Sequence, residues 1–178
     1  MVGAAPQPNL AERHEREQYF FDAVTVREWA GVAARFENPC ILCAPTVGAE
    51  LKGRATVLDT DERFAVYAGF RRWDLNAPDH LQDRFGVILC DPPFFAVSLG
   101  RLAAAIDLLS GYDPAQPVAV TYLKRREKPL LEALGRFALA PTGSRPRYRT
   151  VDTSGRNEIE VYANFAWGGP GAVQRSAS

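Results

Sequence analysis

The stretch "VILCDPPFFAVSLG" (87–100) runs from four apolar or soft residues into an aspartate, two prolines, two phenylalanines and then a helical pattern. A short apolar run that ends at prolines is typical of a strand buried on both faces, as in a parallel sheet. Two successive prolines hold the backbone extended and remove two N–H donors. The stretch therefore predicts a buried strand, a rigid exit whose carbonyls are free to accept hydrogen bonds, and a helix behind it.

Apolar runs of strand length recur along the chain, each followed by a helical pattern. They are "PCILCAP" (39–45), "RATVLDT" (54–60), "GVILCD" (86–91) and "PVAVTYL" (117–123). Helices are expected at 61–67, 96–110 and 124–135, and the periodicity of 12–36 favours a long amphipathic helix or a helix pair. Alternation of buried strands with helices predicts a parallel sheet covered on both faces.

The end of the chain has a different pattern. "RPRYRTVD" (145–152) and "EIEVYANF" (158–165) alternate in polarity on either side of "TSGRN", which has turn composition. They predict an antiparallel hairpin, so that the fold class is a three-layer α/β sandwich with a mostly parallel sheet. We expect one domain over 13–166, between flexible tails at 1–12 and 167–178 that are rich in small residues, Pro and Gly.

The amino-acid composition limits the partners and cofactors that can be expected. The 178 residues carry 21 basic and 21 acidic side chains, so no global field attracts a polyanion and any contact with nucleic acid has to be local. The three cysteines are an odd number in apolar surroundings, which favours reduced thiols packed in the core over a disulfide framework or a metal site. No run approaches the length of a membrane span, and we expect a cytoplasmic protein that needs no metal.

Ligands of open α/β sheets bind beyond the carboxyl ends of the strands. "DTDERF" places Asp59 and Asp61 at such an end, where one of them can hold the ribose of an adenosine-containing cofactor while the other caps the next helix. "CAPTVG" (43–48) lacks the glycine fingerprint that a pyrophosphate requires, which argues against NAD or FAD. S-adenosylmethionine has no pyrophosphate and is the cofactor expected here.

The "DPPFF" segment suits an acceptor that is a planar group bearing an amine. Asp91 and the carbonyls beside it can accept the hydrogens of an NH2 group, and Phe94 or Phe95 can supply a flat ring. Methyl transfer from a sulfonium would then depend on positioning and on electrostatic stabilisation of the nitrogen. Whether Asp91 also removes the proton stays open, and the alternative is a proline-stiffened loop that only closes a strand.

"DPPF" resembles motif IV of amino-methyltransferases. Together with "QYFFD" (18–22), "CAPTVG", "DTDERFAVYAGFRRWDLNAP" (59–78) and "EIEVYANF", it makes most of the chain similar to the N6-adenine methyltransferase-like family. That family includes lysine methyltransferases of eukaryotic elongation factor 1-alpha and a ribosomal RNA adenine methyltransferase with a CCHC zinc finger, whose zinc ligands this chain lacks. The resemblance implies a Rossmann-like seven-stranded methyltransferase sheet with an S-adenosylmethionine site.

The resemblance also implies roles for individual residues. Gln18 and Tyr19 would lie near the cofactor and the substrate entrance. Ala44, Pro45 and Thr46 would border the methionine moiety, and Asp59 or Asp61 would face the ribose. Asp74 and Leu75 would flank the adenine of the cofactor. Asp91, Pro92, Pro93 and Phe94 would form the site for the acceptor amine.

Three functions are compatible with this pattern. The acceptor is N6 of an adenine in RNA or DNA, a lysine of a protein such as a translation factor, or nothing at all if the chain is a degenerate, non-enzymatic binding partner. Balanced charge favours a protein acceptor. The two phenylalanines favour a base, and so do Arg145, Arg147 and Arg149, which would share one face if their segment is a strand, although they also suit a solvated edge strand. The predicted acceptor is adenine, in RNA rather than DNA.

Overall fold

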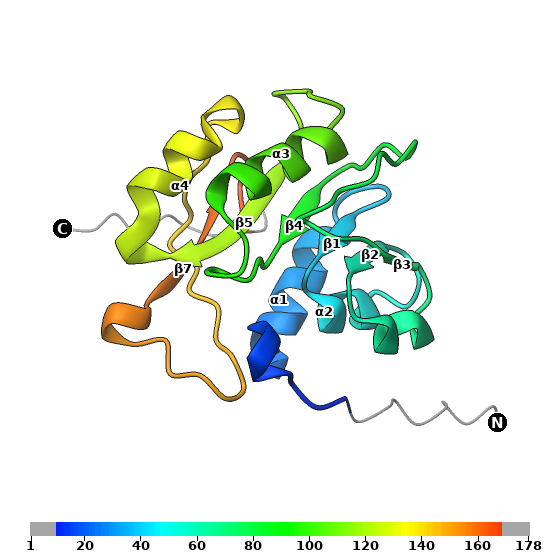
Figure 1. The fold of residues 1–178 in the computed structure, drawn as a ribbon, viewed down its shortest axis with the longest axis horizontal. Helices are drawn as coiled ribbons and strands as arrows, with labels where there is room; N and C mark the ends of the chain where they lie inside the picture. Colours follow the sequence, from blue (N-terminus) through cyan, green and yellow to red (C-terminus); the bar gives the residue numbers. More distant parts are fainter. Residues whose placement is uncertain (1–9, 169–178) are drawn as a thin grey trace.

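A computed structural model describes residues 10–168 (Figure 1). Its centre is a seven-stranded sheet with the order β3-β2-β1-β4-β5-β7-β6. The strands are β1 (Cys40–Leu42), β2 (Thr56–Asp59), β3 (Phe70–Arg72), β4 (Ile88–Cys90), β5 (Val118–Leu123), β6 (Ala140–Pro141) and β7 (Ile159–Ala163). The first five are parallel, and β7 runs antiparallel between β5 and β6, so the predicted α/β class is confirmed.

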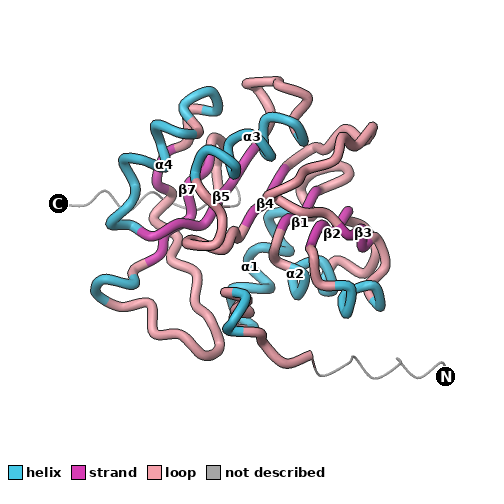
Figure 2. The backbone as a smooth tube through the Cα atoms, in the orientation of Figure 1, coloured by secondary structure: helices cyan, strands magenta, loops and turns pink. Residues whose placement is uncertain are grey.

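Helices cover both faces of this sheet and make three layers (Figures 1 and 2). The α-helices are α1 (Ala23–Ala33), α2 (Pro45–Glu50), α3 (Leu99–Leu109) and α4 (Glu127–Ala133). The 3-10 turns are η1 (His14–Arg16), η2 (Glu62–Val66), η3 (Lys124–Arg126), η4 (Gly135–Phe137) and η5 (Gly155–Asn157). Side chains of α1 and α2 pack in one core cluster, and those of α3 and α4 pack in the other.

The two clusters follow the alternation of side chains along a strand. In β4, Ile88 and Cys90 face α3 and α4, whereas Leu89 faces α1 and α2. All three are fully buried. Burial on both faces explains why the predicted strands read as continuous apolar runs, and it fixes the register of the sheet.

The N-terminal segment is not one continuous helix. Of the periodic stretch 12–36, only η1 and α1 are helical, and residues 18–22 between them are extended. Asp22 ends the extended part, because its Oδ1 accepts the Thr25 N–H at 2.8 Å and caps α1. The prediction of one long helix is therefore wrong, and the helix-pair alternative holds only with a single 3-10 turn as its first member.

The predicted hairpin is wrong in one of its strands. β7 forms as expected, but its antiparallel partners are β5 and β6, and 145–152 contains no strand. The backbone of 145–152 instead pairs with the extended N-terminal segment: Asp22 N–H donates to Arg147 O at 2.8 Å and Arg149 N–H donates to Phe20 O at 2.9 Å. These backbone groups are therefore not available to β7.

The three alternating arginines consequently do not form a strand face. Arg145 pairs with Glu158 at 2.5 Å and Arg147 pairs with Asp22 at 3.2 Å. The Arg149 guanidinium lies over the Phe20 ring, 5.5 Å from its centroid. All three side chains hold the 145–152 segment to its neighbours.

The predicted tails fall almost wholly outside the described residues. At their inner ends, Glu12 accepts hydrogen bonds from Phe20 N–H at 2.8 Å and Thr150 Oγ1 at 2.5 Å, and Trp167 is buried in the cluster of α1. The packed part of the chain thus extends past both ends of the expected 13–166 domain. Among the helices described, none combines the length and the apolar character that crossing a bilayer requires.

Candidate active site

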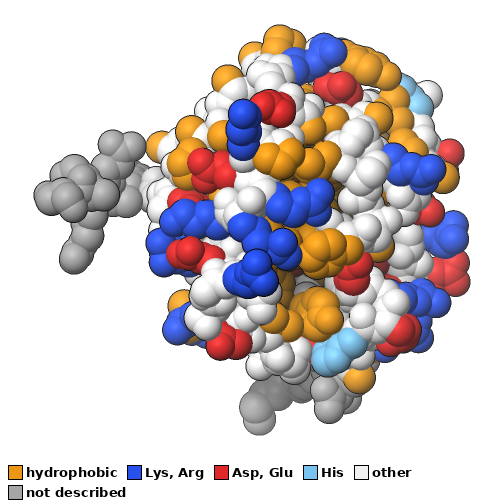
Figure 3. All heavy atoms as spheres, turned by 60° about the vertical axis from the view of Figure 1, so that its left-hand side comes forward, with side chains coloured by type: hydrophobic (Ala, Val, Ile, Leu, Met, Phe, Trp, Pro, Cys, Tyr) orange, Lys and Arg blue, Asp and Glu red, His pale blue; other side chains and the backbone are white. Residues whose placement is uncertain are grey.

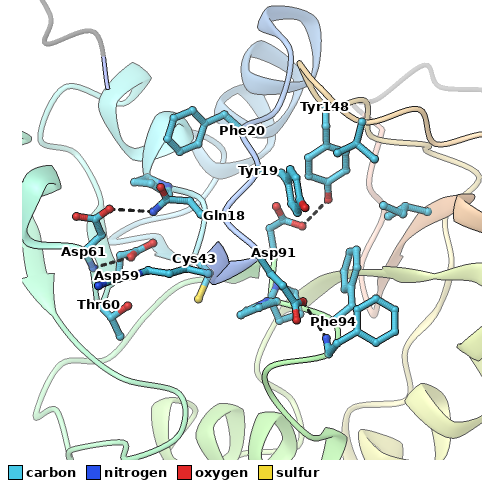
Figure 4. A pocket seen from close by; sticks show the side chains of 18 of the residues that line it. Gln18, Tyr19, Phe20, Cys43, Asp59, Thr60, Asp61, Asp91, Phe94 and Tyr148 are labelled. Carbon is cyan, nitrogen blue, oxygen red and sulfur yellow. Dashed lines mark hydrogen bonds between the residues drawn. The ribbon is translucent and has the colours of Figure 1, made fainter. Parts of the chain in front are cut away.

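A cavity of about 310 Å³ opens at the carboxyl ends of the parallel strands (Figure 4). It lies where the strand order reverses, since Cys43 follows β1 and Asp91 follows the adjacent β4, whose exit is tied to β1 by an Asp91 N–H to Leu42 O hydrogen bond of 3.0 Å. The rest of its wall comes from the segments that cross this edge. The lining residues include Arg16, Glu17, Gln18, Tyr19, Phe20, Pro45, Asp59, Thr60, Asp61, Pro92, Pro93, Phe94, Phe95, Leu123, Tyr148 and Asn157.

Asp91 is held by two hydroxyl groups. Tyr148 Oη donates to Asp91 Oδ1 at 2.6 Å, and Thr121 Oγ1 donates to the same oxygen. Oδ2 receives no donor from the described part of the chain. Burial raises the pKa of Asp91 to about 7, although both hydroxyl hydrogen bonds oppose that rise. One oxygen is therefore fixed and the other is free toward the cavity.

The loop behind Asp91 is clamped from both sides. Arg126 donates to Phe94 O at 3.1 Å, and Phe95 N–H donates to Glu17 Oε2 at 3.0 Å. The Phe94 ring packs edge-on against Tyr122, with centroids 5.4 Å apart. The carbonyl of Pro92 accepts no hydrogen bond from the described residues. The predicted arrangement of a stiff acidic corner with a free carbonyl and an aromatic ring is present.

Asp59 and Asp61 occupy the other end of the cavity, together with Gln18 (Figure 4). Both carboxylate oxygens of Asp61 are engaged, since Arg63 donates to each of them and Gln18 Nε2 donates to Oδ2 at 3.0 Å. The pKa of Asp61 lies well below its usual range, because hydrogen bonds from Arg63 and Gln18 outweigh the opposing effect of burial. Asp61 thus organises this end of the cavity.

Asp59 is buried but accepts fewer hydrogen bonds than Asp61. Its Oδ1 accepts the Asp61 N–H at 2.9 Å, and its Oδ2 has no donor among the described residues. Burial raises its pKa to about 6, which a second carboxylate at Asp61 reinforces. Of the two candidates for the ribose, Asp59 is the one with an open oxygen.

The other residues predicted to contact the cofactor lie at different distances from the cavity. Pro45 lines the cavity and starts α2, while Ala44 is buried just before it. Thr46 borders a separate cavity of about 270 Å³. Asp74 and Leu75 follow β3 and do not contact the main cavity, so their expected place beside the cofactor's adenine stays a prediction.

The two cysteines of "CILC" have different environments. Cys40 is fully buried within β1, as predicted. Cys43 lies beyond the strand, lines the cavity and has a left-handed backbone with φ of 59°. Burial raises the pKa of its thiol well above the usual range, so it lines the wall as a neutral group rather than as a thiolate.

Two partners of Asp91 were missed by reasoning from the sequence. Thr121 could have been found from the sequence, because it is a hydroxyl residue within the apolar run "VAVTYL", and the structure shows it fully buried. No feature of the sequence indicates Tyr148 as a partner, since it is 57 residues from Asp91 and belongs to an irregular segment.

The donor set fits S-adenosylmethionine. The cofactor carries a positive sulfonium, and Asp59, Asp61 and Asp91 place carboxylates along the cavity that would attract it. Asp59 Oδ2 is available to a pair of ribose hydroxyls. Pro45, Phe20 and Cys43 add an apolar wall without glycine-rich phosphate chemistry.

A sheet of this order with such a cavity at its carboxyl edge is the fold of S-adenosylmethionine-dependent methyltransferases of known structure. Solved structures share the fold at low identity. An S-adenosylmethionine-dependent methyltransferase from Clostridium acetobutylicum has a TM-score of 0.56 and 8% identity over 78% of this chain and 90% of its own. The N-methyltransferase NodS from Bradyrhizobium japonicum has a TM-score of 0.53 and 14% identity, over 80% and 96% of the two chains.

Magnesium protoporphyrin IX methyltransferase from Synechocystis, with bound S-adenosylmethionine, has a TM-score of 0.53 and 13% identity, over 79% of this chain and 76% of its own. The family described as "Probable N6-adenine methyltransferase" matches residues 12–167, and the chain belongs to that family. No curated protein matches it. The chain is therefore an S-adenosylmethionine-dependent methyltransferase of this family.

Proposed function

We propose that the protein methylates N6 of adenine in nucleic acid, with RNA preferred to DNA. The observation that carries this proposal is the difference between the two carboxylate oxygens of Asp91. Two hydroxyls hold Oδ1 in place, Oδ2 accepts no hydrogen bond from the described residues, and Pro92 and Phe94 line the same cavity. Two acceptors beside an aromatic ring match a planar base with an exocyclic NH2 group, which has two hydrogens to donate.

The acceptors direct the nitrogen as well as bind it. When both N–H hydrogens point at Asp91 Oδ2 and the Pro92 carbonyl, the lone pair of the amine points elsewhere, and Phe94 limits the tilt of the base. Methylation leaves one surplus proton on the nitrogen. Asp91 is suited to accept that proton, since its pKa of about 7 lies close to the operating pH.

The other end of the cavity would hold the cofactor. Asp59 Oδ2 would accept from the ribose hydroxyls, while Gln18 and Arg63 keep the neighbouring Asp61 in place. Bound S-adenosylmethionine supplies an electrophilic methyl group. Figure 4 shows the two ends on opposite sides of the same cavity, so both ligands would meet between them.

Charge in the cavity favours a neutral amine over lysine. Apart from Asp61, which is paired with Arg63, three acidic residues, Glu17, Asp59 and Asp91, line it, against one basic residue, Arg16. Nearby carboxylates stabilise an ammonium ion and raise its pKa above the ordinary value of about 10.4. A lysine would then lose its proton less readily, whereas the amine of adenine is already neutral.

The test is methyl transfer from labelled S-adenosylmethionine to total RNA, DNA and cell protein in parallel. We expect label in RNA that digestion to nucleosides recovers as N6-methyladenosine. Asp91→Asn is the control, because it keeps an oxygen for Thr121 and Tyr148 and should bind the cofactor without transferring methyl. Label in protein alone would refute the nucleic-acid acceptor and leave lysine as the acceptor.

A further inference from the structure

Phe95 is an exposed aromatic ring at the mouth of the cavity. Phe95 lines the cavity, yet 65% of the residue is exposed, the largest value among the exposed large hydrophobic residues of the described chain. The hydrogen bond from its N–H to Glu17 fixes the backbone at this position. An ordered aromatic ring facing solvent is a platform for another flat group.

One arginine lies over this ring, and two others belong to the segments next to it. The Arg125 guanidinium lies over Phe95 at 6.0 Å from the centroid, and its Nε donates to Arg156 O at 3.1 Å. Arg125 therefore links the loop after β4 to η5, whose Asn157 also lines the cavity. Arg126 donates from its Nη1 to Phe94 O, so it stands on the same rim.

These three arginines are not neutralised. None of them forms an ion pair within residues 10–168, whereas the nearby Glu158 is paired with Arg145 at 2.5 Å and with Lys124 at 3.8 Å. The chain as a whole has equal numbers of acidic and basic residues, so the excess of positive charge is local. Figure 3 shows Lys and Arg side chains gathered in the middle of one face, next to hydrophobic side chains.

We propose that Phe95, Arg125, Arg126 and Arg156 form a rim that binds the single-stranded nucleic acid next to the target base. Phe95 stacks on a neighbouring base and the arginines contact phosphates, while the target adenine enters the cavity. Proteins that bind single strands combine aromatic platforms with positive charge in this way. This inference rests on the proposed function and adds the form of the substrate, a single strand and not a duplex.

The test measures binding of a fluorescent, adenine-containing single-stranded RNA by anisotropy at several salt concentrations. Phe95→Ala should raise Kd about fivefold or more, the lower end of what loss of one stacked base costs. Arg125→Ala combined with Arg156→Ala should weaken binding and reduce the slope of log K against log salt by about 1.4, which is ~0.7 for each phosphate contact. Arg126 is left unchanged because it also supports Phe94.

Lys128→Ala is the matched control, since it removes an exposed positive charge that instead faces Glu132 along α4. We expect it to bind RNA like the wild type. All variants should retain wild-type affinity for S-adenosylmethionine by calorimetry, which shows that they are folded.

The outcomes separate this inference from the proposed function. RNA methylation by the wild type together with unchanged RNA affinity and salt slope in both rim variants would overturn the rim and leave the function standing. Wild-type binding that favours duplex over single-stranded RNA would also overturn it. Label in protein alone in the transfer assay would overturn the proposed function, and the rim with it.

Discussion

Tyr148→Phe removes one oxygen atom and tests how Asp91 is positioned. In the wild type, the Tyr148 hydroxyl donates to Asp91 Oδ1 at 2.6 Å and thereby favours the ionised carboxylate. A hydrogen bond to a charged group contributes about 1.5–3 kcal/mol, which corresponds to a pKa change of about one to two. Without the hydroxyl, the pKa of Asp91 should therefore rise from about 7 to about 8 or above.

The consequence appears in the pH dependence of the rate. If the ionised carboxylate is the active form, about half of the wild type is active at pH 7, and only about a tenth of the variant is. We expect kcat/KM at pH 7 to fall about fivefold or more, the acid limb of the profile to move upward by about one pH unit, and most of the rate to return near pH 9. Affinity for S-adenosylmethionine should not change.

The assay is methyl transfer from labelled cofactor between pH 6 and 9.5. Tyr162→Phe is the matched control, because it removes another phenol hydroxyl that donates to an acid, Glu127, at 2.9 Å but does not line the cavity. It should lower stability without moving the acid limb. A Tyr148→Phe enzyme with the wild-type rate and limb would refute the positioning role, and a lower rate at every pH without a moved limb would show that the hydroxyl acts only on structure.

Three further predictions concern stability and cofactor binding. Because the pKa of Asp91 is raised in the folded state, the stability linked to its proton is fully present below about pH 4 and is lost as the pH rises through about 7. Asp91→Asn should therefore stabilise the cofactor-free protein by up to about 4 kcal/mol at pH 8 and by less at pH 5. Equal gains at both pH values in urea denaturation would contradict this. Asp59→Asn should weaken S-adenosylmethionine binding about tenfold or more in calorimetry, whereas Asp61→Asn should chiefly lower the melting temperature; the reverse pattern would assign the ribose to Asp61. Gly48→Ala should lower the free energy of unfolding by about 1–3 kcal/mol, because the new Cβ would lie 2.3 Å from Val57 Cγ2. Gly31→Ala is the control and should be neutral or stabilising, since no atom lies within 4 Å of its Cβ. A Gly48→Ala protein as stable as the wild type would show that α2 can shift on β2.

The partly exposed β3 was not predicted, but the sequence alone was sufficient for the other four parallel strands, β1, β2, β4 and β5, and for the acidic corner after β4. Each of those strands is buried on both faces, so burial appears as an uninterrupted apolar run such as "VILC". The corner is equally local, since prolines constrain their own backbone and the residue before them. Asp59, Asp61 and Asp91 could be assigned to one site because parallel strands end at one edge of the sheet.

Only the tertiary structure decided which groups surround those acids. The alternating pattern of 145–152 predicts a strand, but its backbone bonds to the extended segment that precedes α1, a choice between long-range partners that local periodicity does not contain. The same crossing brings Tyr148 to Asp91. Likewise, Asp59 and Asp61 are equivalent in the sequence, and they differ only because Arg63 and Gln18 saturate one carboxylate and leave an oxygen of the other open. Hydrogen-bond partners depend on contacts between distant segments, and these exist only once the chain has folded.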